Sequence, residues 1–233
     1  MKKNLLITRK HLMKIKAFLL TIVVIFSVFN MNSCKEEVKD REYNEAEVIA
    51  AAKDLIKKSE KLNVIYYGHG IKADINDVDN ASGYYYPADV LSLSELGIQK
   101  VEDIKALTRE CYTKAQSEYM INNTFAPVRD SDGEIIHFSR YYQEYDTFDR
   151  NEEKCIMVYS KYEPFLVDTV EYFYDTVRVV DVEGEVIIVE INVKVTSEDG
   201  NVQEKSIKVN LLEEENGFRL DSPTYARNTQ IQE

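Results

Sequence analysis

Cysteine and histidine are the residues of this chain that could carry nucleophilic or metal chemistry, and the sequence contains three of each. Cys111 falls on the apolar face of an expected helix and Cys155 falls in an apolar strand. A disulfide in an oxidising compartment and two buried thiols both fit these positions. A Cys–His nucleophile pair would require His69 or His137, and no local pattern marks either histidine as a partner. No close Cys/His pairs indicate a zinc site, so we expect no metal and no cofactor.

Acidic residues form the second set that could do chemistry. Segment 72–80 is rich in Asp and Asn, but it lacks the Asp or Asn at the fifth position and the Gly at the sixth that a helix–loop–helix calcium site requires. The stretch Asp130-Ser-Asp-Gly-Glu134 predicts a plain turn. Asp146 and Asp149 lie in a charged turn with no sign of burial, so the sequence does not indicate a catalytic acid–base pair. We expect no catalytic residue and a protein that is not an enzyme.

The first 33 residues resemble a bacterial lipoprotein signal peptide. A basic segment precedes an apolar run of 13 residues, Ala17 to Phe29, and a membrane-spanning helix needs roughly 20. The run leads to Asn30-Met-Asn-Ser-Cys34, in which a small residue followed by Cys resembles a lipobox. Cys34 would then be lipidated and become the first residue of the mature protein. An ordinary cleaved signal with an unrelated Cys and a retained membrane anchor are the alternatives.

The residues that follow bear on localisation and partners. Lys35-Glu36-Glu37 resembles the acidic export signal of Bacteroidetes surface lipoproteins, so we expect an outer-membrane lipoprotein of the cell envelope, with display at the cell surface as one option. Without residues 1–33, 200 residues remain with 41 Asp and Glu against 23 Lys and Arg, a formal charge of −18. This charge disfavours nucleic acid and anionic lipid headgroups as partners. The Cys34 lipid would be the sole membrane contact, and we expect a monomer.

Hydrophobic periodicity predicts helices first and strands afterwards. Asn44 is a candidate N-cap of a helix that extends to about residue 62, and further helices are expected at 101–112 and 113–121. Segment 71–90 is expected to be a long irregular loop. Strands are predicted at 135–142, 154–160, 174–182, 185–196, 202–213 and 218–220.

The alternation is clearest in the hairpin from Glu185 to Leu212, whose strands flank an Asp-Gly-Asn turn. One face of this hairpin is apolar and must be covered. We therefore predict an α+β fold in which N-terminal helices pack on a curved antiparallel sheet of about 5–6 strands. The expected division of the chain is a signal peptide at 1–33, a flexible tether at 34–43, a single domain at 44–226 and a polar tail at 227–233.

Three segments of the chain carry a family resemblance. They are Leu62-Asn-Val-Ile-Tyr-Tyr-Gly-His-Gly-Ile71, the helix Val101-Glu-Asp-Ile-Lys-Ala-Leu-Thr108 followed by Tyr112-Thr-Lys114, and Gly217-Phe-Arg-Leu-Asp-Ser-Pro-Thr-Tyr225. In this order they resemble the IseA family of DL-endopeptidase inhibitors, which usually has Trp where this chain has Phe218. The resemblance implies a cystatin-like α+β domain that binds a cell-wall peptidase of the NlpC type, blocks its Cys–His cleft and performs no chemistry.

The inhibitor hypothesis places the partner contact on the loop at 71–90. Tyr84, Tyr85 and Tyr86 would supply rigid contact area. Asp77 and Asp79 would supply negative charge for the approach to a basic cleft. The alternative is that these tyrosines pack back on the domain.

Two other functions also fit the sequence. The chain could be an exported binding module that holds a small ligand or glycan on its concave sheet, and Tyr141, Tyr142 and Tyr145 are then the candidates to line that site. It could instead be a structural or assembly lipoprotein.

The lipid anchor can be tested by labelling cells with palmitate. We expect the wild-type chain to be labelled and Cys34→Ala to be unlabelled, because the substitution removes the thiol that would be acylated. Equal labelling of the two chains would rule out lipidation at this cysteine.

Overall fold

The computed structural model describes residues 43–76, 85–145 and 154–226. They belong to a compact unit that begins at Glu42. Within the described ranges, no helix is both long and apolar enough to cross a membrane. Some residues singled out from the sequence lie outside the described ranges: Cys34, Asp77, Asp79, Tyr84, Asp146 and Asp149.

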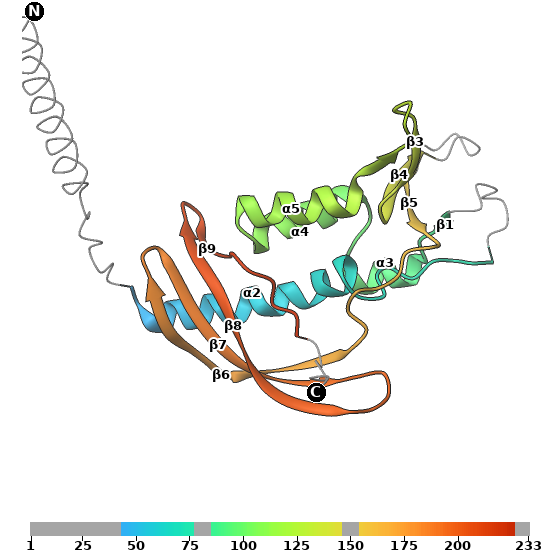
Figure 1. Ribbon diagram of the computed structural model, residues 1–233. Helices are drawn as coiled ribbons and strands as arrows, with labels where there is room; N and C mark the ends of the chain where they lie inside the picture. Colours follow the sequence, from blue (N-terminus) through green and yellow to red (C-terminus); the bar gives the residue numbers. More distant parts are fainter. Residues whose placement is uncertain (1–42, 77–84, 146–153, 227–233) are drawn as a thin grey trace, which may run out of the picture. The chain divides into compact units, whose positions relative to one another are not determined.

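The described residues form helices and antiparallel strands, which confirms the predicted α+β class (Figure 1). The helices are α2 (Glu45–Tyr66), α3 (Val90–Leu96), α4 (Val101–Cys111) and α5 (Lys114–Phe125). The strands are β1 (Tyr85–Pro87), β2 (Pro127–Arg129), β3 (Ile135–Phe138), β4 (Tyr141–Tyr145), β5 (Lys154–Tyr159), β6 (Thr169–Glu183), β7 (Val186–Thr196), β8 (Val202–Glu214) and β9 (Gly217–Leu220).

The largest sheet has the strand order β6-β7-β8-β9 and contains the hairpin predicted from the sequence. On β7, alternate side chains from Val189 to Val195 are fully buried, and Val209 and Leu211 on β8 are buried with them. Burying one apolar side chain of this size stabilises a fold by about 1.5–3 kcal/mol. This face of the sheet is therefore the main part of the core.

The long helix α2 covers that face and lies between strands β6–β8 and the helices α4 and α5 (Figure 1), whose junction also contacts β9. Its first turn is capped by Asn44, whose side-chain oxygen accepts a hydrogen bond from the amide of Ala46 at 3.2 Å, as predicted. Its apolar stripe includes Val48, Ala52 and Ile56, all fully buried. Buried side chains fill most of the covered face of the sheet, and a hollow of about 270 Å³ remains between the end of α2 and the start of β6.

The described strands divide among three sheets of four, three and two strands, so the largest sheet has four strands where the sequence predicted about 5–6. The expected strand 135–142 is interrupted at Ser139 and Arg140. The amides of these two residues donate to the carbonyls of Ala126 and Thr124 at the end of α5, at 2.9 and 3.1 Å. β3 consequently pairs with β2, whereas β4 and β1 flank β5 beyond the carboxyl ends of α2 and α5 (Figure 1).

The segments that carried the family resemblance meet in the interior. The Tyr66 hydroxyl is 2.8 Å from the Thr108 hydroxyl, which joins α2 to α4. The side-chain amide of Asn63 donates to Thr224 Oγ1 at 3.0 Å, and Ser59 Oγ lies 2.5 Å from that oxygen. These buried polar groups have hydrogen-bond partners on other segments, and this fixes how the three segments are oriented.

The start of α5 is tied to the last strand in the same way. Thr113 caps α5 by accepting from the amide of Gln116, which confirms the predicted restart of the helix. The amide of Thr113 also donates to the carbonyl of Leu220 at 2.9 Å, and its hydroxyl donates to the Asp221 carboxylate at 2.7 Å. The chain near Asp221 is thereby held against the helices, and the residues that follow reach the end of α2.

Candidate functional site

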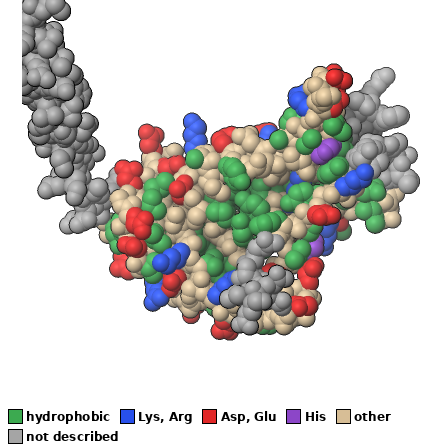
Figure 2. All heavy atoms as spheres, viewed as in Figure 1, with side chains coloured by type: hydrophobic (Ala, Val, Ile, Leu, Met, Phe, Trp, Pro, Cys, Tyr) green, Lys and Arg blue, Asp and Glu red, His purple; other side chains and the backbone are tan. Residues whose placement is uncertain are grey.

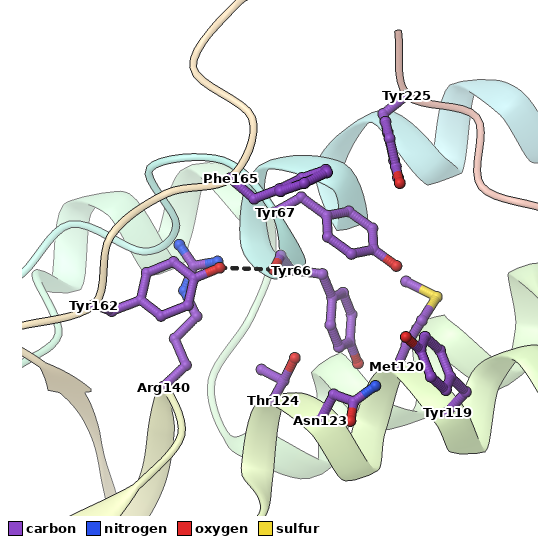
Figure 3. Close-up of a pocket in the computed structure, with 10 residues that line it drawn as sticks. All are labelled: Tyr66, Tyr67, Tyr119, Met120, Asn123, Thr124, Arg140, Tyr162, Phe165 and Tyr225. Carbon is purple, nitrogen blue, oxygen red and sulfur yellow. Dashed lines mark hydrogen bonds between the residues drawn. The ribbon is translucent and has the colours of Figure 1, made fainter. Parts of the chain in front are cut away.

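An open hollow of about 320 Å³ lies between α2 and α5. The end of α2, α5, the chain between β3 and β4, the loop after β5 and the segment after β9 all contribute to it. Figure 2 shows hydrophobic side chains gathered in the middle of this face. We call this site the aromatic hollow, and its rings belong to Tyr66, Tyr67, Tyr119, Tyr162, Phe165 and Tyr225 (Figure 3).

The tight end of α2 places two tyrosines at the hollow. The amides of Tyr67 and Gly68 both donate to the carbonyl of Asn63 at 2.9 Å. The chain then turns through Gly70, whose φ of 77° lies in the left-handed region that favours glycine. The turn follows directly after Tyr66 and Tyr67 and leaves their rings beside α5 (Figure 3).

One wall of the hollow consists of three rings from three separate segments. The ring centroids of Tyr67 and Tyr225 are 4.9 Å apart, and that of Phe165 is 5.7 Å from Tyr225 and 6.3 Å from Tyr67. Aromatic rings attract one another over such distances. The amide of Leu166 donates to the carbonyl of Tyr67 at 2.7 Å and holds the loop in place. Burial raises the pKa of Tyr67, so its hydroxyl is neutral at physiological pH.

α5 forms another side of the hollow with Tyr119, Met120, Asn123 and Thr124 (Figure 3). The side chain of Tyr119 is 63% exposed, whereas Met120 is buried. An exposed tyrosine beside an open hollow offers apolar surface and a hydroxyl to a bound molecule. The side-chain amide of Asn123 adds a donor and an acceptor.

Arg140 is a buried cation at the side of the hollow, with Tyr162 next to it (Figure 3). The residue is 2% exposed. Its guanidinium carbon lies 3.8 Å from the ring centroid of Tyr162 and 5.1 Å from that of Tyr141. Nη2 donates to the carbonyl of Gly68 at 2.6 Å. Nε and Nη1 have no hydrogen-bond acceptor among the described residues.

The surroundings of Arg140 are unusual for a buried charge. No ion pair formed by the described residues includes it. Burial lowers the pKa of Arg140, but an arginine stays charged in proteins. A buried charge whose donors lack acceptors reduces stability. Stacking on two tyrosine rings offsets part of this cost, and two of its three nitrogens still lack an acceptor.

Tyr85 and Tyr86, which the sequence assigned to a partner contact, differ in how deeply they are buried. Segment 71–90 is not irregular throughout, since Tyr85 and Tyr86 belong to β1 and α3 begins at Val90. Tyr85 is 7% exposed, its hydroxyl donates to the carbonyl of Phe138 at 3.3 Å, and its ring packs on Tyr142 at 4.6 Å. Tyr85 therefore packs back on the domain, whereas Tyr86 is half-buried.

The two cysteines of the domain are not joined by a disulfide. Cys111 is fully buried at the end of α4, where its thiol donates to the carbonyl of Leu55 at 3.3 Å. Cys155 is half-buried on β5, in the sheet formed by β1, β5 and β4. Burial raises the pKa of the Cys111 thiol to about 12. His69 is exposed, and His137 stacks on Tyr159 at 4.6 Å. A neutral, buried thiol is a poor nucleophile, so Cys111 is not placed for covalent chemistry.

Among the described residues, no three His, Cys, Asp or Glu side chains lie close enough together to hold a metal. Tyr141 is fully buried, and its hydroxyl donates to the carbonyl of Ile65 at 3.0 Å. Tyr142 is half-buried and stacks on Phe138. Both tyrosines, which the sequence suggested as the lining of a ligand site, also line an open hollow of about 380 Å³ beside the start of α4, together with Phe125 and Phe138.

The β2–β3 hairpin is a second exposed feature of the domain (Figure 1). Its apolar side chains Val128, Ile135 and Ile136 are 36%, 47% and 57% exposed. The turn that joins its strands is the predicted one, with the Asp130 carboxylate accepting from the amides of Asp132 and Glu134 at 3.0 and 2.9 Å. The hairpin thus combines exposed apolar side chains with an acidic turn.

No family model matches the chain, and no curated protein matches it either. The geometry of the described residues is therefore the basis of the functional proposals below.

The residues of the aromatic hollow were only partly visible from the sequence. Tyr66, Tyr67 and Tyr225 lie in the segments that carried the family resemblance, but no role was assigned to them. The sequence places Arg140 in a continuous strand from Ile135 to Tyr142. Its charge, next to the polar Ser139 and between aromatic residues, was the signal that could have identified it.

Gly70→Ala tests how closely Arg140 packs on the turn after α2. A Cβ at this position would overlap the guanidinium of Arg140 and the hydroxyl of Tyr141. Gly184→Ala is the matched control, because its φ of 66° is also positive and a Cβ there meets nothing within 4 Å. We expect the control to lose about 1–2 kcal/mol of unfolding free energy through backbone strain. Gly70→Ala should lose at least about 2 kcal/mol more, because buried groups must move.

Urea unfolding followed by circular dichroism measures both losses. Equal destabilisation of the two variants would contradict the close contact between Arg140 and this turn.

Proposed function

We propose that the described domain is a non-catalytic binding domain whose ligand occupies the aromatic hollow. The observation that carries this proposal is the convergence of six aromatic rings from four segments of the chain on one open hollow. Binding sites for small molecules are concave, lined by apolar and aromatic side chains, and supplied with a few polar groups. The aromatic hollow has these properties, with Asn123 and Arg140 among its polar groups.

The size of the hollow limits what it can hold. A volume of about 320 Å³ is at the lower end of the about 300–1,000 Å³ that ligand sites span. This volume suits a small molecule, or one or two residues of a longer chain, with an apolar or aromatic body. The aromatic hollow is proposed in place of the concave sheet, because α2 covers most of that face and the hollow left beside β6 has one tyrosine ring, Tyr172, among its described lining residues.

The location of the protein is proposed on the sequence alone. The signal segment and Cys34 support an exported lipoprotein of the cell envelope, tethered through its lipid. The domain would then meet ligands outside the cytoplasm.

Titration with the neutral probe N-acetylphenylalaninamide, followed by two-dimensional NMR, tests the proposed site. We expect weak binding with a dissociation constant on the order of millimolar, and chemical-shift changes around the end of α2, α5 and Phe165. Phe165→Ala should weaken binding at least about fivefold, because a stacked ring contributes about 1 kcal/mol. Phe165 is 44% exposed and Tyr43 is 37% exposed, so Tyr43→Ala is the matched control and should bind like the wild type.

Shift changes spread over the whole surface, or an equal loss in both variants, would contradict binding in the hollow.

A second candidate function is the peptidase inhibition implied by the resemblance to the IseA family. The β2–β3 hairpin favours it, because an exposed two-stranded hairpin with apolar side chains can enter the cleft of a partner. Its acidic turn, with Asp130, Asp132 and Glu134, would suit a cleft with basic groups and would raise the rate of association more than the affinity. The peptidase would be of the NlpC type.

Cleavage of a stem peptide by NlpC-type peptidases, measured with and without the chain from Glu36 onward, tests this candidate. We expect inhibition by the wild type and at least about tenfold weaker inhibition by the double variant Ile135→Ser/Ile136→Ser, which removes exposed apolar contact area. Val202→Ser is the control, because Val202 is a β-strand residue that is also 57% exposed. Unchanged cleavage at saturating wild-type protein would exclude inhibition of those enzymes.

A further inference from the structure

We propose that the ligand of the aromatic hollow carries a carboxylate and that Arg140 is the residue that binds it. This inference rests on the proposed function of the hollow, and it adds the chemical class of the ligand. The ligand would be an apolar carboxylate about the size of one or two amino-acid residues, such as the carboxyl end of a peptide.

The first argument is the balance of charge in the hollow. Arg140 is the one charged side chain among the described residues that line it. The hollow between α2 and α4 differs, because Lys57 and Lys61 share it with Asp54 and Asp103. In the aromatic hollow, by contrast, a single cation faces a site without an anion. A monoanionic group would neutralise it, whereas a phosphate of nearly two negative charges would be only half neutralised.

The second argument is the hydrogen-bonding capacity of the guanidinium. Arginine has five N–H donors. A described residue accepts a hydrogen bond from Nη2, whereas none accepts one from Nε or Nη1. Nη2 donates one hydrogen to the carbonyl of Gly68, and the guanidinium also interacts with the hydroxyl of Tyr141. Nε and Nη1 remain without an acceptor, and an N–H edge of a guanidinium that includes such a nitrogen binds a carboxylate through two parallel hydrogen bonds.

The third argument is that the guanidinium is already held in place. It lies over the rings of Tyr162 and Tyr141, at 3.8 and 5.1 Å, and it packs so closely on the turn at Gly70 that a Cβ there would overlap it. A group that is ordered before binding loses little entropy when the ligand arrives. The rings contact the face of the guanidinium, and a carboxylate needs only its edge.

Access to that edge depends on Tyr162. Tyr162 lies in the irregular stretch between β5 and β6, is half-buried and lines the same hollow. Its hydroxyl donates to the carbonyl of Tyr66 at 3.3 Å, which is a long hydrogen bond. A small rotation of the Tyr162 side chain would break this hydrogen bond and open a path from the hollow to Nε and Nη1. The hydrogen bonds of the carboxylate with Arg140 would compensate for the one that is lost.

The test compares N-acetylphenylalanine with N-acetylphenylalaninamide, which differ only in the carboxylate, using the wild-type protein and NMR titration. We expect the carboxylate to bind at least about tenfold more tightly and to shift the Arg140 Nε–H resonance, while the amide leaves that resonance in place. Equal affinities for the two probes would overturn the role of Arg140 and leave the proposed function of the hollow intact. Binding of neither probe in the hollow would overturn the proposed function itself.

Variants then assign the preference to the side chain. Arg140→Gln should abolish the difference between the probes. Arg140→Lys should retain part of it, because a lysine keeps the charge but not the two-pronged geometry. Arg178→Gln is the control, since Arg178 is an exposed arginine on β6 that pairs with Glu190. A difference between the probes that persists in Arg140→Gln would contradict the proposal.

Two further outcomes are decisive. If Arg140→Gln does not fold, the Nε–H shift in the wild type still decides the question without a variant. Phenyl phosphate serves as a third probe: tighter binding than the carboxylate would overturn the carboxylate assignment in favour of a phosphate ligand.

Discussion

The packing of α2 against one face of the β6–β9 sheet is the constraint on which the rest of this structure depends. Fully buried side chains of Val189, Ile191 and Val193 on the sheet belong to the same apolar cluster as Val48 and Ile56 on the helix. A strand pair with one apolar face cannot remain exposed to water, and a long amphipathic helix can cover much of that face. Once α2 is in place, α4 and α5 pack on its other side, and the smaller sheets lie beyond its carboxyl end (Figure 1).

The carboxyl end of α2 is where this packing creates a surface for binding. The helix continues past residue 62 to Tyr66, and the turn through Gly68 and Gly70 stops it abruptly. A buried set of hydroxyl and amide groups, including Ser59 and Thr224, ties the segment after β9 to the same helix. These constraints bring the rings of Tyr67, Phe165 and Tyr225, which lie far apart in the chain, into one wall.

Arg140 illustrates how a group that is unfavourable for folding can indicate binding. The domain buries a cation without an anionic partner among its described residues, although the chain is acidic as a whole. Replacing a buried charged group by an apolar side chain of similar volume is often neutral or stabilising. A charge kept in a buried, stacked and incompletely hydrogen-bonded state is better explained by a bound partner than by stability. The β2–β3 hairpin is the opposite case, since its exposed isoleucines would gain from being covered.

The sequence by itself determined the elements whose signal is local. The hairpin of β7 and β8 follows from alternation, the start of α2 from Asn44, and the start of α5 from Thr113, because period and capping depend on residues a few positions apart. The α+β class follows from the order of these elements. Only the tertiary structure decided that the strand predicted at 135–142 breaks at Arg140, that Tyr85 is buried, and that Tyr67, Phe165 and Tyr225 meet. Those outcomes depend on contacts between residues distant in the chain, and no local pattern encodes which distant segment will supply the partner.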